Sequence, residues 1–238
     1  MPVIAKETFG SPVPYAEPSW YSKGHSSPYY TQSHVEWRAR CRKFVEDEVM
    51  PNVSEWEKEK AIPMEIYAKC YRAGLLPSLV GPKGYDYADP VVAAKPQGFD
   101  YFHELIFIDE LCRCGSGGVM WGMMGGLNIG LPTVLNFGTP EMKARVAPPC
   151  VRGEKNICLC ITEPHAGSDV ASIRTTAKLT PDGKHYIVNG QKKWITNGIF
   201  SDYFSVAVRT GGPGMKGISM LLVERGMPGL KTTRMDCQ

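Results

Sequence analysis

Apolar residues in the first half of the chain recur at helical spacing. Between positions 37 and 49 they are Trp37, Cys41, Phe44, Val45 and Val49. This pattern predicts an amphipathic helix that stops at Pro51. A second helix is predicted over residues 63–74, because proline suits the start of a helix and glycine its end. Asp100 is placed to cap a third helix, whose apolar residues between 105 and 111 lie on almost every side, as in a helix buried between others.

Residues 115–130 are rich in glycine and also contain Trp121 and several methionines. Glycine inside a helix costs ~1 kcal/mol relative to alanine, so a helix in this region needs a compensating reason. Close packing against a neighbouring element is one such reason, and a ligand beside the helix is another. The sequence leaves the two open.

From position 157 onward the pattern changes to short apolar stretches separated by Gly, Pro, Asn and Asp. It predicts strands over residues 157–161, 173–179, 186–189, 193–196, 203–209 and 218–223, with another beginning at 231–235. Residues 1–30 are rich in proline, serine and aromatic side chains without any period, and they predict an extended arm. We therefore expect an α+β multidomain protein, with the arm at 1–30, an all-α helical domain at 31–152 and a small antiparallel β-barrel or sandwich domain at 153–238. The β domain is expected to be incomplete, because its last predicted strand has no later segment to pair with.

Charge, cysteines and histidines narrow the classes of function. A formal net charge of +3 gives no reason to expect a nucleic-acid partner, and the basic residues 38–43 are interpreted as the solvated face of a helix. No stretch approaches the ~20 apolar residues of a membrane span, so we expect a soluble protein. The chain starts without a signal peptide, and its eight cysteines are expected to be reduced thiols. Neither the Cys-X-Cys pairs nor the scattered histidines have the spacing of a metal site.

Two segments, 161–169 and 193–198, combine residues that suit a flat, anionic cofactor. Thr162 follows a predicted buried strand, so its hydroxyl emerges where the edge of a ligand can be hydrogen-bonded. After Pro164 ends the strand, the small residues 166–168 let backbone N–H groups approach a pyrophosphate, and Gly167 is able to adopt positive φ. Trp194 offers a broad aromatic face, and Thr196 is expected on the same side of an extended strand. Each segment alone is ordinary turn or core chemistry, so the indication of one site comes from their order and spacing.

These segments, Ile-Thr-Glu-Pro-His-Ala-Gly-Ser-Asp and Lys-Trp-Ile-Thr-Asn-Gly, resemble the flavin-binding signature of the acyl-CoA dehydrogenase family. The resemblance extends to residues 73–76, 137–143, 153–154 and 188–192 and runs from about His34 to the end of the chain. Two positions depart from the family pattern: His165 stands where a small residue is usual, and Leu159 where many members have an aromatic one. Family members carry a third, C-terminal helical bundle after the β domain. The chain is therefore interpreted as a fragment, a truncated gene model or one half of a split protein.

The resemblance implies FAD as the cofactor and assigns contacts with it to both segments. These residues are Leu159, Cys160, Ile161, Thr162, Gly167, Ser168, Trp194, Ile195 and Thr196. In this assignment Thr162 and Thr196 hydrogen-bond the flavin ring, Trp194 flanks it, and Ser168 also binds the substrate. Glu163 is expected to be structural, because the catalytic base of the family belongs to the third domain. No catalytic residue is therefore assigned within this chain.

The implied activity is α,β-dehydrogenation of an acyl-CoA thioester, with hydride transfer to N5 of the flavin. Electrons would then pass to an electron-transfer flavoprotein or to dioxygen. Two alternatives stay open: a flavin-binding relative of the nitroalkane oxidase or flavin monooxygenase type, and a non-catalytic truncated protein. The resemblance further implies a homodimer or homotetramer for a full-length protein. An intracellular location is expected, without a choice among cytoplasm, mitochondrion and peroxisome.

Overall fold

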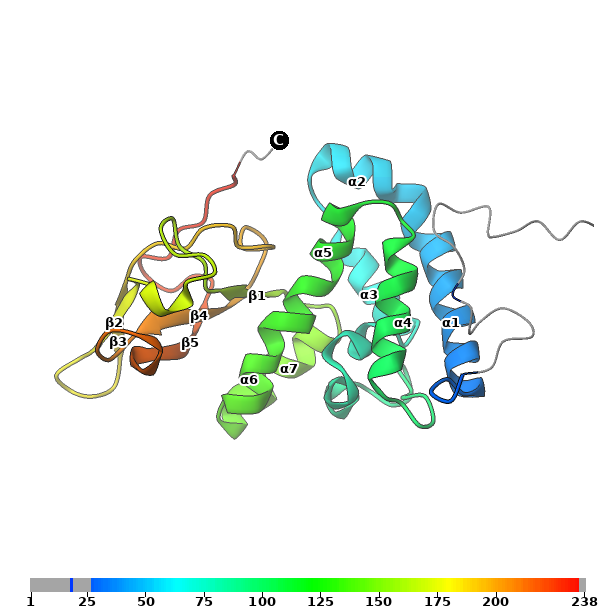
Figure 1. Ribbon diagram of the computed structural model, residues 1–238, viewed down its shortest axis with the longest axis horizontal. Coiled ribbons are helices and arrows are strands. Elements are labelled where there is room, and N and C mark those ends of the chain that lie inside the picture. Colours follow the sequence, from blue (N-terminus) through cyan, green and yellow to red (C-terminus); the bar gives the residue numbers. More distant parts are fainter. Residues whose placement is uncertain (1–17, 19–26, 236–238) are drawn as a thin grey trace, which may run out of the picture.

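The computed structural model describes residue 18 and residues 27–235. Figure 1 shows helices at one end of the molecule and strands at the other, with α5, α6 and α7 between the sheet and the remaining helices. The α-helices are α1 (Gln32–Phe44), α2 (Val53–Glu59), α3 (Met64–Arg72), α4 (Tyr101–Cys112), α5 (Gly117–Gly125), α6 (Leu131–Phe137) and α7 (Pro140–Val151). The strands are β1 (Ile157–Cys160), β2 (Thr176–Leu179), β3 (Tyr186–Asn189), β4 (Tyr203–Arg209) and β5 (Ile218–Glu224).

Short 3₁₀- or π-helical turns join or extend these elements. They are Val45–Val49, Met50–Asn52, Leu76–Val80, Pro82–Tyr87, Gly126–Gly130, Val170–Ser172 and Met215–Gly217. Most of the predicted arm, residues 1–30, lies outside the described residues.

The three predicted helices form where their end signals stand. Pro63 directly precedes α3, and Gly74 just beyond that helix has φ 71°. Asp100 caps α4, because its carboxylate accepts the N–H groups of Phe102 at 2.9 Å and His103 at 3.3 Å. The predicted first helix continues from α1 into the turn Val45–Val49. The short helix α2, which buries Trp56, was not predicted.

The basic stretch 38–43 is not the fully solvated helix face that the sequence predicted. Arg40 and Lys43 are exposed, but Arg38 is 2% exposed and places Nη2 2.7 Å from Oε1 of Glu110. Arg42 lies 2.8 Å from the same oxygen. Because Glu110 on α4 is fully buried, its charge requires cations, and α1 supplies them where it packs against α4.

The sheet is mixed, whereas an antiparallel one was predicted. β4 pairs in parallel with β1, with Ile157 opposite Tyr203, and antiparallel with β5. β2 and β3 form an antiparallel hairpin, and β2 meets β4 in parallel at the pair of Thr176 and Arg209. The long connection from β1 to β4 contains the whole β2–β3 hairpin, so it has the length that a parallel pair requires. The predicted order, a helical domain followed by a β domain, is confirmed.

Three predicted strand segments are corrected. Residues 173–175 precede β2 without joining it, and residues 231–235 form no strand. The segment 193–196 is irregular, because Trp194 has φ 60°, which an extended strand does not allow. In the described part of the chain, residues 231–235 have no neighbouring strand to pair with.

Close packing accounts for much of the glycine in residues 115–130. A Cβ on Gly126 would overlap the carbonyl oxygen of Ile157, and one on Gly130 would lie 3.1 Å from the carbonyl carbon of Cys158. These two glycines therefore let the helix lie directly against the backbone of β1. Gly125 does not face β1: a Cβ on it would lie 3.7 Å from Cγ2 of Thr196. Close packing is thus shown at Gly126 and Gly130, and a ligand beside the helix stays a prediction.

The cysteines of the described residues are free thiols, as predicted: Cys41, Cys70, Cys112, Cys114, Cys150, Cys158 and Cys160. Cys237 lies outside the described residues. Among the helices of the described part, none combines the length and the apolar character that crossing a membrane requires.

Candidate functional site

The two segments singled out in the sequence meet in the fold. The N–H of Lys193 donates to the carbonyl oxygen of Thr162 at 2.9 Å, and Nζ of Lys192 donates to the carbonyl oxygen of Ile161 at 2.9 Å. These bonds place the residues that follow β1 beside the segment that precedes β4. The predicted convergence of residues 161–169 and 193–198 on one place is therefore confirmed.

Trp194 does not stand on a strand, so the expected alternation with Thr196 is wrong. The left-handed backbone at Trp194 is followed by a second one at Asn197, with φ 63°. Asn197 is fixed by its side chain, whose Nδ2 donates to the carbonyl oxygen of Gly122 at 2.7 Å. The side chain of Trp194 is left 59% exposed, with Nζ of Lys193 4.8 Å from the ring centroid. A large aromatic side chain held outward in this way offers a face to a flat ligand.

The threonines beside Trp194 have hydroxyls available to a ligand. Thr162 is half-buried and Thr196 exposed, and neither Oγ1 has a hydrogen-bond partner among the described residues. Thr196 faces α5. A Cβ on Gly125 of that helix would lie 3.7 Å from Cγ2 of Thr196 and 3.5 Å from the ring of Trp121. The site therefore extends from the end of β1 to the surface of α5.

The small residues after Pro164 leave open space. Glu163 and Ala166 exchange backbone hydrogen bonds of 2.9 and 3.3 Å, which close a tight turn, and Gly167 and Ser168 follow it on the surface. Gly167 does not have the positive φ that the sequence suggested, and a Cβ at this position would meet no atom within 4 Å. Nothing in the fold thus requires glycine here. A group outside the chain that approaches the backbone closely would require it.

The predicted contact residues on the strand divide between two environments. Leu159 and Ile161 are half-buried, whereas Cys160 is 4% exposed and packs in a core cluster that Ile195 also joins. Cys160 therefore offers a ligand its backbone groups only, whereas Ile195 is half-buried like Leu159 and Ile161. The sequence reasoning did not identify Lys192 as part of the site. Two signals pointed to it: its place directly before the Lys-Trp-Ile-Thr segment, and the family resemblance of residues 188–192.

Both carboxylate oxygens of Glu163 accept hydrogen bonds from within the protein. Its Oε2 accepts the N–H of Arg174 at 2.7 Å, and its Oε1 accepts the N–H of Thr175 at 3.0 Å and Nζ of Lys192 at 2.8 Å. Burial by itself raises the pKa of Glu163, but the hydrogen bonds from Lys192 and from these N–H groups outweigh it and lower the pKa to about 2. Such a carboxylate stays ionised and is a poor proton acceptor. Its geometry agrees with the structural role that we expected.

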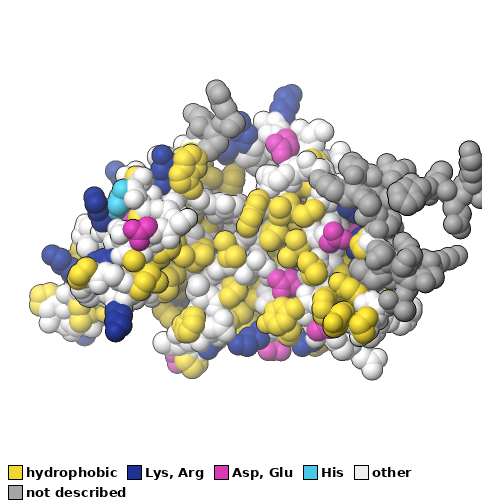
Figure 2. Space-filling view, viewed as in Figure 1, with side chains coloured by type: hydrophobic (Ala, Val, Ile, Leu, Met, Phe, Trp, Pro, Cys, Tyr) yellow, Lys and Arg dark blue, Asp and Glu magenta, His cyan; other side chains and the backbone are white. Residues whose placement is uncertain are grey.

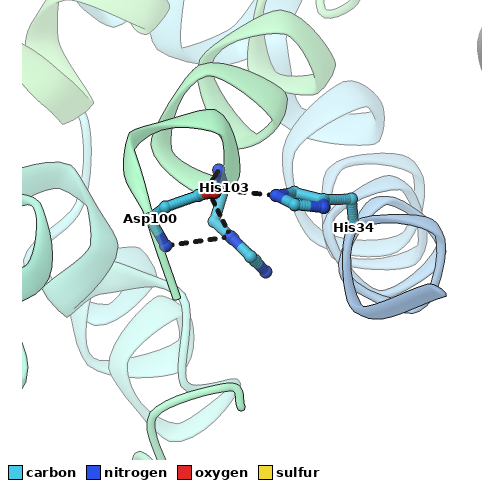
Figure 3. Close-up of side chains that lie close together, drawn as sticks. All are labelled: His34, Asp100 and His103. Atoms are coloured by element: carbon cyan, nitrogen blue, oxygen red, sulfur yellow. Dashed lines mark hydrogen bonds and ion pairs between the residues drawn. The ribbon is translucent and has the colours of Figure 1, made fainter. Parts of the chain in front are cut away.

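A second cluster, shown in Figure 3, was not predicted. His34 of α1 and His103 of α4 meet at the carboxylate of Asp100, with His34 Nε2 and His103 Nδ1 each 3.0 Å from Oδ1. The expectation that the histidines are scattered is wrong for this pair. Two imidazoles and a carboxylate are a common ligand set for zinc, so the cluster is a candidate metal centre by composition.

Hydrogen bonds within the protein already engage this cluster. His34 Nδ1 accepts the N–H of Thr31 at 2.9 Å, and His103 Nδ1 accepts the N–H of Asp100 at 3.2 Å. Because Ser33 gives its hydroxyl proton to a backbone carbonyl, His103 Nε2 donates to Ser33 Oγ at 3.0 Å. His34 therefore accepts at Nδ1 and donates at Nε2 to Asp100, which leaves its ring no free nitrogen lone pair. The role of His103 Nδ1 depends on its tautomer, because it lies near both the N–H and the carboxylate Oδ1 of Asp100. Burial lowers the pKa of His103, in keeping with a neutral ring that caps a helix.

Comparisons with known proteins agree with this arrangement. The family model of the acyl-CoA dehydrogenase N-terminal domain matches residues 31–154, and that of the acyl-CoA dehydrogenase middle domain matches residues 158–237. Acyl-CoA dehydrogenase apdG of Emericella nidulans is 41% identical over 232 residues, which cover 94% of this chain and 53% of that protein. Acyl-CoA dehydrogenase AFT10-1 of Alternaria alternata is 40% identical over 96% of this chain and 53% of its own length.

Solved structures give the same result. The acyl-CoA dehydrogenase of Geobacillus kaustophilus aligns with a TM-score of 0.70 and 37% identity, over 86% of this chain and 51% of that one. An acyl-CoA dehydrogenase of Bacillus anthracis in complex with FAD aligns with a TM-score of 0.72 and 26% identity, over 88% of this chain and 34% of that one. The chain spans about half the length of the two fungal relatives. Through its helical and β domains alike, the chain belongs to the acyl-CoA dehydrogenase family.

Proposed function

We propose that this chain binds FAD at the site formed by residues 159–168 and 194–196. The observation that carries the proposal is the convergence of an exposed Trp194, two threonine hydroxyls that have no partner in the described part of the chain, and an uncrowded Gly167. Trp194 would lie against the flavin ring, and Thr162 and Thr196 would hydrogen-bond its edge. Backbone N–H groups near Gly167 and Ser168 would meet the pyrophosphate, and Ser168 would also touch the substrate. The structure of the B. anthracis relative in complex with FAD supports FAD as the cofactor.

The activity we propose for the whole protein is α,β-dehydrogenation of an acyl-CoA thioester. When bound, FAD supplies the two-electron acceptor that a non-acidic β C–H bond requires. This chain would supply the walls that position the thioester and exclude water from it. The contacts of Glu163 exclude it as the base. In line with the family resemblance, we place the base in a part of the protein outside these residues.

The acyl group would lie along α5. A Cβ on Gly125 would contact both the ring of Trp121 and Cγ2 of Thr196. The end of α5 therefore lies beside Thr196, and the rest of the helix runs away from the proposed flavin position. Figure 2 shows hydrophobic side chains gathered on the face over α4, α5 and α6. Among the exposed hydrophobic residues of α4, α5 and the turn after α5 are Leu105, Trp121 and Ile129, which are 52%, 46% and 40% exposed. Single exposed apolar residues are common, but a continuous face of them indicates a surface that binds an apolar group or another domain.

The wider context of the protein is proposed on the same basis. The electron acceptor would be an electron-transfer flavoprotein or dioxygen, and the full-length protein would be a homodimer or homotetramer. The division into residues 31–152 and 153–238 fits the change from helices to strands between Val151 and Ile157. Two relatives named isobutyryl-CoA dehydrogenase are mitochondrial. An intracellular location remains our proposal, with the compartment left open.

The test is whether purified residues 1–238 retain flavin absorbance through gel filtration. Trp194→Ala is expected to weaken FAD binding up to about tenfold, since an aromatic pair contributes ~0.5–1.5 kcal/mol beyond its buried area. Phe137→Ala is the matched control, because Phe137 is an exposed aromatic residue, 85% exposed, at the end of α6. Equal FAD occupancy in wild type and Trp194→Ala after dialysis would contradict the placement of Trp194. A colourless wild-type protein that FAD does not restore would contradict the proposal itself.

A further inference from the structure

We propose that Glu163 and Lys192 act as a positioning pair, which holds the segment carrying Trp194 and Thr196 against the end of β1. This role rests on the proposed flavin site, because Trp194 and Thr196 are the residues that the pair would position. Neither Glu163 nor Lys192 is assigned a contact with the cofactor or the substrate.

The pair connects the two halves of the site through a buried ion pair. Nζ of Lys192 lies 2.8 Å from Oε1 of Glu163 and donates to the carbonyl oxygen of Ile161 at 2.9 Å. The side chains of Lys192 and Glu163 are 11% and 1% exposed. One residue later, the N–H of Lys193 donates to the carbonyl oxygen of Thr162 at 2.9 Å. Three consecutive links thus tie residues 192–193 to residues 161–163.

Glu163 is the fixed member of the pair. The N–H groups of Arg174 and Thr175 hold both of its oxygens, and the tight turn to Ala166 holds its backbone. Nε2 of His165 also lies 3.4 Å from Oε2 of Glu163, and the side chain of His165 is the more exposed of the two. Lys192 therefore binds to a carboxylate that is already in place, and the position of the 192–197 segment follows from it.

The segment needs such an anchor because its backbone is strained. Trp194 has φ 60°, in the left-handed region that bulky residues rarely adopt, whereas Asn197, with φ 63°, is of a type that adopts it more readily. Asn197 holds the far end through its bond to the carbonyl oxygen of Gly122. Lys192 holds the near end. With both ends fixed, Trp194 is kept exposed beside the threonine hydroxyls and does not collapse onto the protein.

The ion pair is also sensitive to the loss of one partner. Removing the charge of Lys192 leaves a buried carboxylate without its cation, and removing the charge of Glu163 leaves a buried ammonium. The β2–β3 hairpin carries two other lysines, Lys178 on β2 and Lys184 in the turn. Both are exposed, so neither takes the place of Lys192 beside the buried carboxylate. Lys178 therefore serves as a control for the charge alone.

The experiment compares Lys192→Met, Lys192→Arg and Lys178→Met in the chain of residues 1–238. Exchange of the Lys193 N–H with deuterium reports on the link to Thr162 without any flavin, and titration of the apoprotein with FAD reports on the site. Lys192→Met is expected to speed the exchange and to weaken FAD binding by roughly tenfold or more, as loss of a buried charge partner predicts. Lys192→Arg, which keeps the charge, should restore much of both, and Lys178→Met should change neither.

Two results separate this proposal from the proposed function. If wild type binds no FAD, the proposed function fails, while the exchange rate of the Lys193 N–H still decides whether the pair positions the segment. If that rate in Lys192→Met stays within about twofold of Lys178→Met, the positioning role is overturned. If Lys192→Met does not fold, Glu163→Gln replaces it, because this change removes the charge of the other partner. Faster exchange of the Lys193 N–H than in Lys178→Met, with an unchanged unfolding midpoint, supports positioning, and an exchange rate within about twofold of Lys178→Met overturns it.

Discussion

Gly126→Ala should separate close packing from helix propensity in the glycine-rich region. Gly126 begins the π-helical turn after α5, where a Cβ would overlap the carbonyl oxygen of Ile157 and lie 3.4 Å from its carbonyl carbon. The obstacle is the backbone of β1, which cannot rotate away as a side chain can. The helix and the strand would have to separate by roughly 1 Å to restore ordinary contact distances.

The expected net effect is a loss of stability. Alanine gains ~1 kcal/mol over glycine from helix propensity, and overpacking against a rigid neighbour costs typically ~1–3 kcal/mol, occasionally more. We place Gly126→Ala at the upper end of that range because backbone meets backbone, which gives a net loss of about 2 kcal/mol. For a chain of this size, that loss lowers the midpoint of thermal unfolding by roughly 4–8 °C.

Urea unfolding followed by circular dichroism measures this difference, with Gly117→Ala as the matched control. Gly117 is the first residue of α5, and a Cβ there would meet no atom within 4 Å. Gly117→Ala should therefore be neutral or stabilising by up to ~1 kcal/mol. Equal stabilisation by both changes would refute the close contact between the Gly126 turn and β1. An equal loss in both would show that glycine matters here for a reason other than that contact.

Two further outcomes follow from the site. The pKa of Glu163 is lowered from 4.5 to about 2 in the folded protein. The ionised carboxylate therefore stabilises the fold at pH values above about 4.5, and this stabilisation is lost as the pH falls from about 4.5 toward 2. Wild type should lose about 3 kcal/mol more than Glu163→Gln over that range, and equal acid sensitivity in urea unfolding would contradict the assignment. When residues 1–238 loaded with FAD are mixed anaerobically with straight and branched acyl-CoAs, bleaching of the flavin should be slow. A positioned base contributes ~10²–10⁴-fold, and prompt bleaching would reveal one within this chain.

Local chemistry made several features readable from the sequence. Pro63 and Asp100 mark the starts of α3 and α4 because a helix end is decided by groups within three or four residues of it. The apolar runs of β1, β4 and β5 follow from alternation and composition over a few neighbouring residues. The two cofactor segments were recognisable because their residue types and order form a continuous pattern along the chain.

Tertiary structure alone decided which distant groups meet. The sequence predicts a solvated Arg38, since nothing near it along the chain shows that Glu110 is buried against it. The left-handed backbone of Trp194 was missed because intrinsic preference opposes it, and it persists only between the anchors at Lys192 and Asn197. Lys192 reaches Glu163 from 29 residues away, and β1 pairs in parallel with β4 across the intervening hairpin. Such contacts depend on the path of the whole chain, so the residue types of the site were set by the sequence and their geometry by the fold.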